Sequence, residues 1–117
     1  MRLAIVGSRD FTDYKRLKSW ASILIRGVNP LEVIIISGGA RGADSLARKF
    51  ANLWDFPFEE YAAHWDELGK SAGFARNKEM AEEADIVLAF WDGKSPGTKH
   101  MIDASIKLSK PTIIVPS

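Results

Sequence analysis

The sequence predicts an α/β fold, a Rossmann-like three-layer sandwich in which a five-stranded parallel sheet lies between two layers of helices. Five short apolar runs alternate with four segments whose apolar residues recur at helical spacing, which is typical of a parallel sheet with helical crossovers. Right-handed crossovers leave few arrangements of such strands, and we expect the spatial order 3-2-1-4-5. The chain of 117 residues is expected to form a single domain over residues 1–117.

The expected strands are rich in aliphatic and β-branched residues, as strands buried on both faces of a sheet should be. In chain order they are residues 3–6, 33–36, 56–61, 86–90 and 112–115. The third is half polar because of Glu59 and Glu60, so it is expected at an edge of the sheet. In the predicted order, the first and fourth strands are neighbours whose crossovers leave in opposite directions. A crevice is therefore expected beyond their carboxyl ends.

Between the strands, apolar side chains recur three and four residues apart, which predicts helices that cover the sheet. The expected helical segments are residues 14–25, 46–51, 72–84 and 101–108. Phe74 and Met80 are expected on the inward face of the third helix, and Leu108 on that of the fourth.

The composition is that of an ordinary soluble globular protein, with 46% hydrophobic and 26% charged residues and a net charge of +1. This charge neither favours nor excludes nucleic acid as a partner. The absence of cysteine excludes a thiolate metal site, and two isolated histidines make a poor one, so no metal is expected. No run is long enough to span a membrane, and the first apolar run is too short for a signal peptide. We expect a cytoplasmic protein without a membrane partner.

The most informative segment is a glycine-rich turn at residues 37–44, between an expected strand and an expected helix. Glycine lets a ligand approach the main chain, and a helix N-terminus offers unpaired N–H groups and a positive dipole end. The turn therefore predicts an anion-binding site with phosphate as its ligand. Its predicted ligand-binding residues are Ser37, Gly38, Gly39, Ala40, Arg41, Gly42 and Asp44.

Three further loops are expected to border the same crevice, because each follows a strand or opens a helix on the same side of the sheet. Their glycine, hydroxyl and basic residues can receive an oxyanion, although a plain turn, a helix cap or a solvated charge explains each one as well. The predicted ligand-binding residues in these loops are Gly7, Ser8, Arg9, Lys70, Arg76, Asn77, Trp91, Asp92, Gly97 and Thr98.

Asp44 and Asp92 need a separate explanation, because a phosphate repels a neighbouring carboxylate. Asp44 lies in the first turn of its expected helix, where it can simply favour the helix dipole. Otherwise both residues suit the hydroxyls of a ribose or the amino groups of a base, as acidic residues do in dinucleotide sites. Trp91 can stack on a base with Trp65 nearby, although packing explains tryptophans as well. These residues point to a nucleotide rather than to inorganic phosphate.

At these motifs the chain resembles the SLOG superfamily of Rossmann-like proteins, which includes the LOG phosphoribohydrolases and DNA-processing protein A. It is most similar to the small, stand-alone YspA/YpsA-related SLOG proteins. The matching segments are residues 6–10, 37–44, 65, 69–70, 72–73, 76–77, 91–93 and 97–98. The resemblance covers nearly the whole chain and implies a binding or sensing module for a nucleotide or a nucleotide-derived ligand related to NAD or ADP-ribose.

The resemblance leaves catalysis open. LOG hydrolases carry a Gly-Gly-x-Gly-Thr-x-x-Glu motif whose glutamate serves the cleavage of an N-glycosidic bond, whereas Met101 stands in that place here. Such cleavage builds oxocarbenium character that a carboxylate normally stabilises, so the change favours binding over chemistry. If the protein is a nucleotide phosphoribohydrolase, Asp44 and Asp92 are its candidate catalytic residues.

A third function is single-stranded DNA binding, which the resemblance to DNA-processing protein A implies. Four basic residues, Arg9, Arg41, Lys70 and Arg76, would then follow the phosphates of the strand. No cofactor is required by the sequence beyond a bound nucleotide or NAD-derived ligand. Because small domains of this kind also self-associate, a homo-oligomer is compatible with the sequence.

Overall fold

The computed structural model describes residues 1–64 and 69–117, with the side chain of Lys70 excepted. A five-stranded parallel sheet runs through the protein in the order β3-β2-β1-β4-β5. Its strands are β1 (Arg2–Gly7), β2 (Ile34–Gly38), β3 (Phe58–Tyr61), β4 (Ile86–Trp91) and β5 (Thr112–Pro116). The predicted fold class and strand order are both confirmed, and the half-polar strand β3 lies at an edge as expected.

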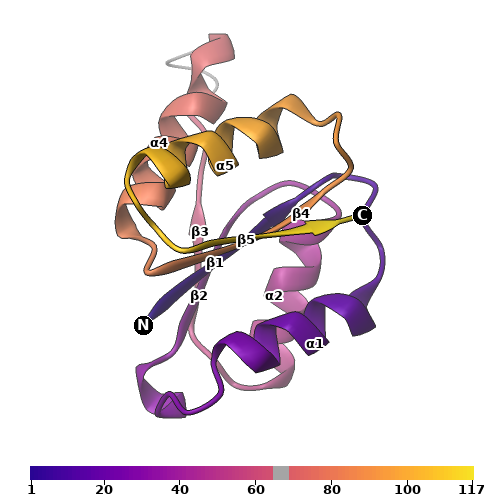
Figure 1. Cartoon of the computed structure of the whole chain (residues 1–117), viewed down its shortest axis with the longest axis vertical. Coiled ribbons are helices and arrows are strands. Elements are labelled where there is room, and N and C mark those ends of the chain that lie inside the picture. Colours follow the sequence, from indigo (N-terminus) through magenta and orange to yellow (C-terminus); the bar gives the residue numbers. More distant parts are fainter. Residues whose placement is uncertain (65–68) are drawn as a thin grey trace.

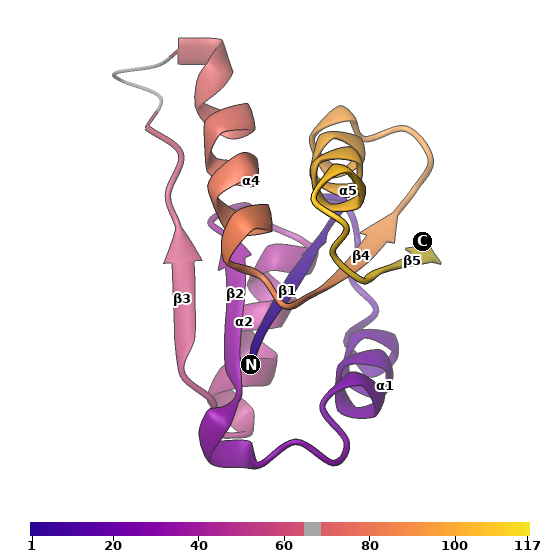
Figure 2. The ribbon, with the colours of Figure 1, turned by 60° about the vertical axis from the view of Figure 1, so that its left-hand side comes forward.

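Helices cover both faces of the sheet and complete three layers (Figures 1 and 2). The pair α1 (Tyr14–Leu24) and α2 (Ala43–Leu53) lies on one face, and the pair α4 (Ala72–Glu83) and α5 (Pro96–Lys107) lies on the other. Two short 3-10 turns, η1 (Pro30–Glu32) and η2 (Gly69–Ser71), precede β2 and α4. In the part of the chain that the structure describes, no helix is both long enough and apolar enough to cross a membrane.

Successive side chains of the central strands point to opposite faces and build two separate apolar cores. On the α1 and α2 face, Leu3 and Ile5 of β1 pack in one cluster with Phe50 of α2. On the opposite face, Ala4 of β1 packs in a second cluster with Met80 of α4. Full burial of a side chain such as Phe50 stabilises the fold by about 1.5–3 kcal/mol. The two cores hold the helices at fixed positions around the carboxyl ends of the strands.

Two residues expected to point inward are exposed. Phe74 is 52% exposed because it lies in the first turn of α4, which extends past the end of the sheet (Figure 2). Its ring packs instead against the imidazole of His100 in α5, tilted by 32° with 4.3 Å between ring centroids. Leu108 follows the last residue of α5 and is 41% exposed. Helical spacing predicts which side chains share a face, but not where along the helix the sheet ends.

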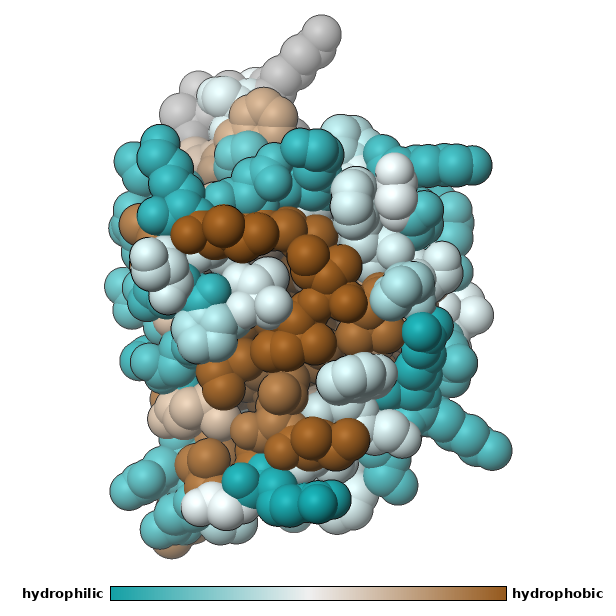
Figure 3. Space-filling view, in the orientation of Figure 1, coloured by the Kyte–Doolittle hydropathy of each residue, from teal (hydrophilic) through white to brown (hydrophobic). Residues whose placement is uncertain are grey.

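An apolar area lies on the outer face of the molecule, over β5 between α5 and α1 (Figure 3). Ile106 of α5 and Ile114 of β5 are among the exposed hydrophobic residues of these elements. In the described part of the chain, β5 is an edge strand with no strand paired to its outer side. Self-association of this protein stays a prediction from the sequence.

Candidate functional site

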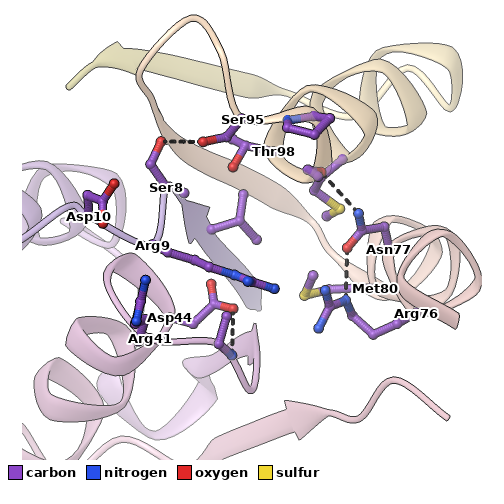
Figure 4. Close-up of a pocket in the computed structure, with 16 residues that line it drawn as sticks. Ser8, Arg9, Asp10, Arg41, Asp44, Arg76, Asn77, Met80, Ser95 and Thr98 are labelled. Carbon is purple, nitrogen blue, oxygen red and sulfur yellow. Dashed lines mark hydrogen bonds between the residues drawn. The ribbon is translucent and has the colours of Figure 1, made fainter. Parts of the chain in front are cut away.

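A cleft of about 440 Å³ opens beyond the carboxyl ends of β1, β2 and β4, where the sequence places its crevice (Figure 4). Its walls come from the loop after β1, the loop between β2 and α2, the middle of α4 and the first turns of α5. β1 and β4 are neighbours in the sheet whose connections run to opposite faces, and open α/β sheets bind ligands at such a point.

Many of the residues predicted for ligand binding meet in this cleft although they come from distant parts of the chain. The predicted residues among its lining are Gly7, Ser8, Arg9, Ala40, Arg41, Asp44, Arg76, Asn77, Gly97 and Thr98. The lining residues that the prediction missed are Val6, Asp10, Met80, Ser95, Pro96 and Met101.

The remaining predicted residues lie outside the cleft lining. Ser37 and Gly38 end β2, and Gly39 and Gly42 lie between β2 and α2. Trp91 is the last residue of β4, and Asp92 opens the loop after it. The side chain of Lys70 and the whole of Trp65 lie outside the described residues.

The glycine-rich turn shapes the cleft wall, and two of its amides are bonded within the protein. The backbone N–H of Ala40 donates to Asp44 Oδ2 at 3.2 Å, and the N–H of Ala43 donates to the carbonyl of Ser8 at 3.3 Å. The N-terminus of α2 thus docks against the loop after β1. Gly42 permits this docking, because its φ is 77° and a Cβ there would collide with the carbonyl oxygens of Ser8 and Arg9.

Gly42→Ala is therefore expected to lower the free energy of unfolding by about 2 kcal/mol or more, because it adds a backbone collision to the strain of a positive φ. Urea denaturation measures the loss. Gly27→Ala is the matched control, because Gly27 has a φ of 84° but no atom within 4 Å of its Cβ position. Equal losses in the two variants would contradict the docking of α2 on the loop after β1.

The first turn of α5 presents unpaired donors to the cleft. The helix begins at Pro96 after Ser95, whose side chain makes no capping hydrogen bond, and the backbone N–H groups of Gly97 and Thr98 lie in the unbonded first turn. Thr98 is 7% exposed, lines the cleft, and its hydroxyl has no hydrogen-bond partner in residues 1–64 and 69–117. The hydroxyl and the two N–H groups are therefore open to hydrogen bonds with a ligand in the cleft.

Three guanidinium groups surround the cleft without forming ion pairs. Within the described residues, Arg9, Arg41 and Arg76 make no salt bridge with any carboxylate. Arg9 and Arg76 extend toward each other from opposite walls (Figure 4). Arg76 Nη1 lies so close to Gly38 that a Cβ at position 38 would collide with it. Glycine at position 38 thus leaves room for the guanidinium, and this explains the residue without a ligand.

Asp44 lies beside Arg9 at the base of the cleft and is 7% exposed (Figure 4). Burial raises the pKa of its carboxyl to about 6, and the amide of Ala40, the hydroxyl of Ser37 and the guanidiniums of Arg76 and Arg9 offset only part of that rise. With Asp10, two aspartates stand against three arginines in the lining, so the cleft carries a positive charge. Asp44 can accept hydrogen bonds from a ligand's hydroxyl or amino groups.

Trp91 and Asp92 hold the loop after β4 in place. The carboxylate of Asp92 accepts hydrogen bonds from the backbone N–H groups of Lys94 at 2.8 Å and Ser95 at 2.7 Å, which lower its pKa to about 2. Trp91 Nε1 donates to the carbonyl of Ser95 at 3.1 Å, and its indole packs against the apolar core under α4 and α5. The two residues therefore orient Ser95 and the start of α5.

Comparison with known proteins shows the family of this chain. A family model described as YAcAr, the YspA, cpYpsA-related SLOG family, matches residues 1–67. The chain belongs to this family. The YAcAr chain is also 37% identical to the Gene 61 protein of Mycobacterium phage D29 over 121 residues, which cover 96% of this chain and 94% of that protein.

Solved structures share the fold of the YAcAr chain at low sequence identity. DNA processing protein A from Streptococcus pneumoniae superposes with a TM-score of 0.76 at 18% identity, over 99% of this chain and 50% of that one. DNA processing protein A from Helicobacter pylori superposes with a TM-score of 0.74 at 23% identity, over 100% of this chain and 66% of that one. That structure is described in a study of the protein's single-stranded DNA binding mode. TM1055 superposes with a TM-score of 0.67 at 18% identity, over 95% of this chain and 71% of that one. The YAcAr chain thus spans half the length of the pneumococcal protein.

Proposed function

We propose that this SLOG protein is a binding or sensing module for a nucleotide or a nucleotide-derived ligand of the NAD or ADP-ribose type. The observation that carries the proposal is the unbonded first turn of α5: within the described residues, the N–H groups of Gly97 and Thr98 and the Thr98 hydroxyl have no partner, and they border a cleft with three arginines that form no ion pair. A phosphate at this point would accept hydrogen bonds from the amides and hydroxyl of the helix turn and would complement both the dipole and the guanidiniums.

The rest of the cleft suits the sugar and the base. Asp44 lies apart from the helix turn, beside Arg9, where a carboxylate can accept from ribose hydroxyls or an exocyclic amino group (Figure 4). Val6, Met80 and Met101 form the apolar floor of the cleft, and each is at most 5% exposed. A volume of about 440 Å³ is in the range of small-molecule sites. Because Met101 supplies a thioether and no carboxylate, the proposal is binding without hydrolysis.

Thermal denaturation with ADP-ribose, NAD, AMP and cyclic nucleotides tests the proposal. At a hundred times its dissociation constant, a ligand adds about 2.7 kcal/mol to stability, which raises the melting temperature measurably. Thr98→Val, which removes only the hydroxyl, is expected to weaken the binding of the stabilising ligand about tenfold. Thr98→Ser keeps the hydroxyl and should bind nearly as well as the natural sequence. A melting temperature that none of the ligands raises would contradict the proposal.

Single-stranded DNA is the second candidate ligand, because the matched Helicobacter pylori fold is described as binding it. Binding of a strand through several phosphates predicts an affinity that falls steeply with salt, with a slope near −0.7 per phosphate contact. A nucleotide held in the cleft through one or two phosphates should lose far less affinity. Fluorescence anisotropy of a labelled oligothymidine between low and moderate salt separates the two functions.

A further inference from the structure

Asn77 lies in the cleft wall, but its side-chain amide is bonded inside the protein. The residue is 4% exposed. Its Oδ1 accepts a hydrogen bond from Arg76 Nε at 2.9 Å, and its Nδ2 donates to the carbonyl of Gly97 at 3.1 Å (Figure 4). The same Nδ2 lies 3.3 Å from His100 Nδ1. The side chain therefore connects α4, which carries it, to the first two turns of α5.

The imidazole of His100 is suited to accept the second proton of this amide. Its ring packs against the tilted ring of Phe74, with 4.3 Å between centroids. Partial burial lowers the pKa of His100, against the opposite effect of Asp103. A neutral imidazole whose Nδ1 accepts carries its own proton on Nε2. Both amide protons of Asn77 then have partners within the protein, and none remains to donate to a phosphate.

The partners of Asn77 are parts of the proposed phosphate site. The bond to Arg76 Nε fixes the plane of that guanidinium, whose two terminal nitrogens have no hydrogen-bond partner within the described residues. The bond to Gly97 fixes the turn whose amides and Thr98 hydroxyl face the same space. We propose that Asn77 is a positioning residue that aligns the Arg76 guanidinium and the N-terminal turn of α5 on one anion, and that it does not itself touch the ligand. This inference rests on the proposed function.

The first experiment examines the contacts of Asn77 without any ligand. Nitrogen NMR of the His100 ring is expected to show a neutral Nε2-protonated tautomer in the natural protein. Asn77→Leu removes the donor and should shift the tautomer balance. Asn77→Asp places a carboxylate beside Nδ1 and should raise the pKa of His100, because it stabilises the protonated ring. Asn52→Leu, at an exposed asparagine of α2, is the matched control and should change neither. A His100 tautomer and pKa unchanged in both Asn77 variants would overturn the inference.

The second experiment uses inorganic pyrophosphate as the probe, with calorimetric affinities for Arg76→Ala, Asn77→Leu and the double variant. In the natural protein, Asn77→Leu should weaken pyrophosphate binding several-fold. In the Arg76→Ala variant the same substitution should weaken it by a smaller factor, because Asn77 acts partly through Arg76. Factors that simply multiply would mean that Asn77 acts independently of Arg76, which overturns the inference. If the natural protein does not bind pyrophosphate, the proposed function fails on that point. The His100 spectra then decide whether the contacts of Asn77 exist.

Discussion

Asp44→Asn is expected to stabilise the protein at neutral pH by about 3 kcal/mol. In the folded protein burial raises the pKa of this carboxyl from 3.8 to about 6. The folded state therefore binds more protons than the unfolded state between these values, and stability falls as pH rises through that window. Asparagine does not ionise, so the variant escapes the loss. The gain should be nearly absent at about pH 3.5 and complete above about pH 7.

Urea denaturation of both proteins across this pH range measures the effect, because all other carboxyls titrate alike in the two and cancel in the difference. Asp92→Asn is the control of opposite sign. Hydrogen bonds lower the pKa of Asp92 to about 2, so its ionised form stabilises the fold above pH 3.8, and its replacement should destabilise the protein at neutral pH. A stability gap between the natural protein and Asp44→Asn that does not vary with pH would contradict the burial of this carboxylate.

A carboxylate that lowers stability at neutral pH is an unusual choice at the base of a cleft lined by arginines. Asparagine or serine would fill the position without an ionisation penalty. The proposed function accounts for Asp44, because an ionised carboxylate accepts stronger hydrogen bonds from ribose hydroxyls than an amide oxygen does. Asp44→Asn should therefore bind pyrophosphate at least as well as the natural protein and bind ADP-ribose less well. The opposite order would remove Asp44 from the sugar side of the site.

Arg76→Ala is expected to weaken the binding of phosphate-containing ligands by about 10- to 100-fold. A charge-assisted hydrogen bond contributes about 1.5–3 kcal/mol, and each 1.4 kcal/mol is tenfold in affinity. Its guanidinium makes no salt bridge within the described residues, but its Nε donates to the buried Oδ1 of Asn77, so Arg76→Ala should also lower the free energy of unfolding by about 1–3 kcal/mol. Calorimetric titration with ADP-ribose gives the affinity, and urea denaturation gives the stability.

Arg26→Ala is the matched control for this experiment. Arg26 is an exposed arginine just after α1 and away from the cleft lining, so its loss should alter neither quantity. An Arg76→Ala protein that binds ADP-ribose as tightly as Arg26→Ala would place the phosphates elsewhere. Gly38→Ala offers an independent check, since its Cβ would displace the Arg76 guanidinium and should weaken binding in the same direction.

The loops of the site could be predicted because topology decides where they go. In a parallel sheet every loop after a strand reaches the same edge, so the positions of Arg9, Asp44 and Thr98 follow from the hydrophobic pattern and the handedness of crossovers. What each side chain does there depends on contacts that the pattern does not encode. The Arg76 guanidinium fills the space next to Gly38, and the carboxylate of Asp92 accepts a hydrogen bond from a backbone N–H of its own loop.

The apolar part of the cleft was missed for a different reason. Met80 and Met101 are fully buried helix residues, and a sequence pattern that predicts burial does not distinguish a core position from a cleft wall. The distinction depends on where α4 and α5 diverge, which is a property of helix packing. Met101 carried one usable signal, because it stands where the related hydrolases have a glutamate.

Amide NMR during titration with ADP-ribose is the most direct test of a nucleotide site at the start of α5. We predict saturable shifts of the Gly97 and Thr98 amides together with those of the loop after β1, and in Thr98→Val a midpoint at about tenfold higher ligand concentration. Spectra without saturable change at millimolar ligand, or with changes confined to residues outside the cleft, would contradict it.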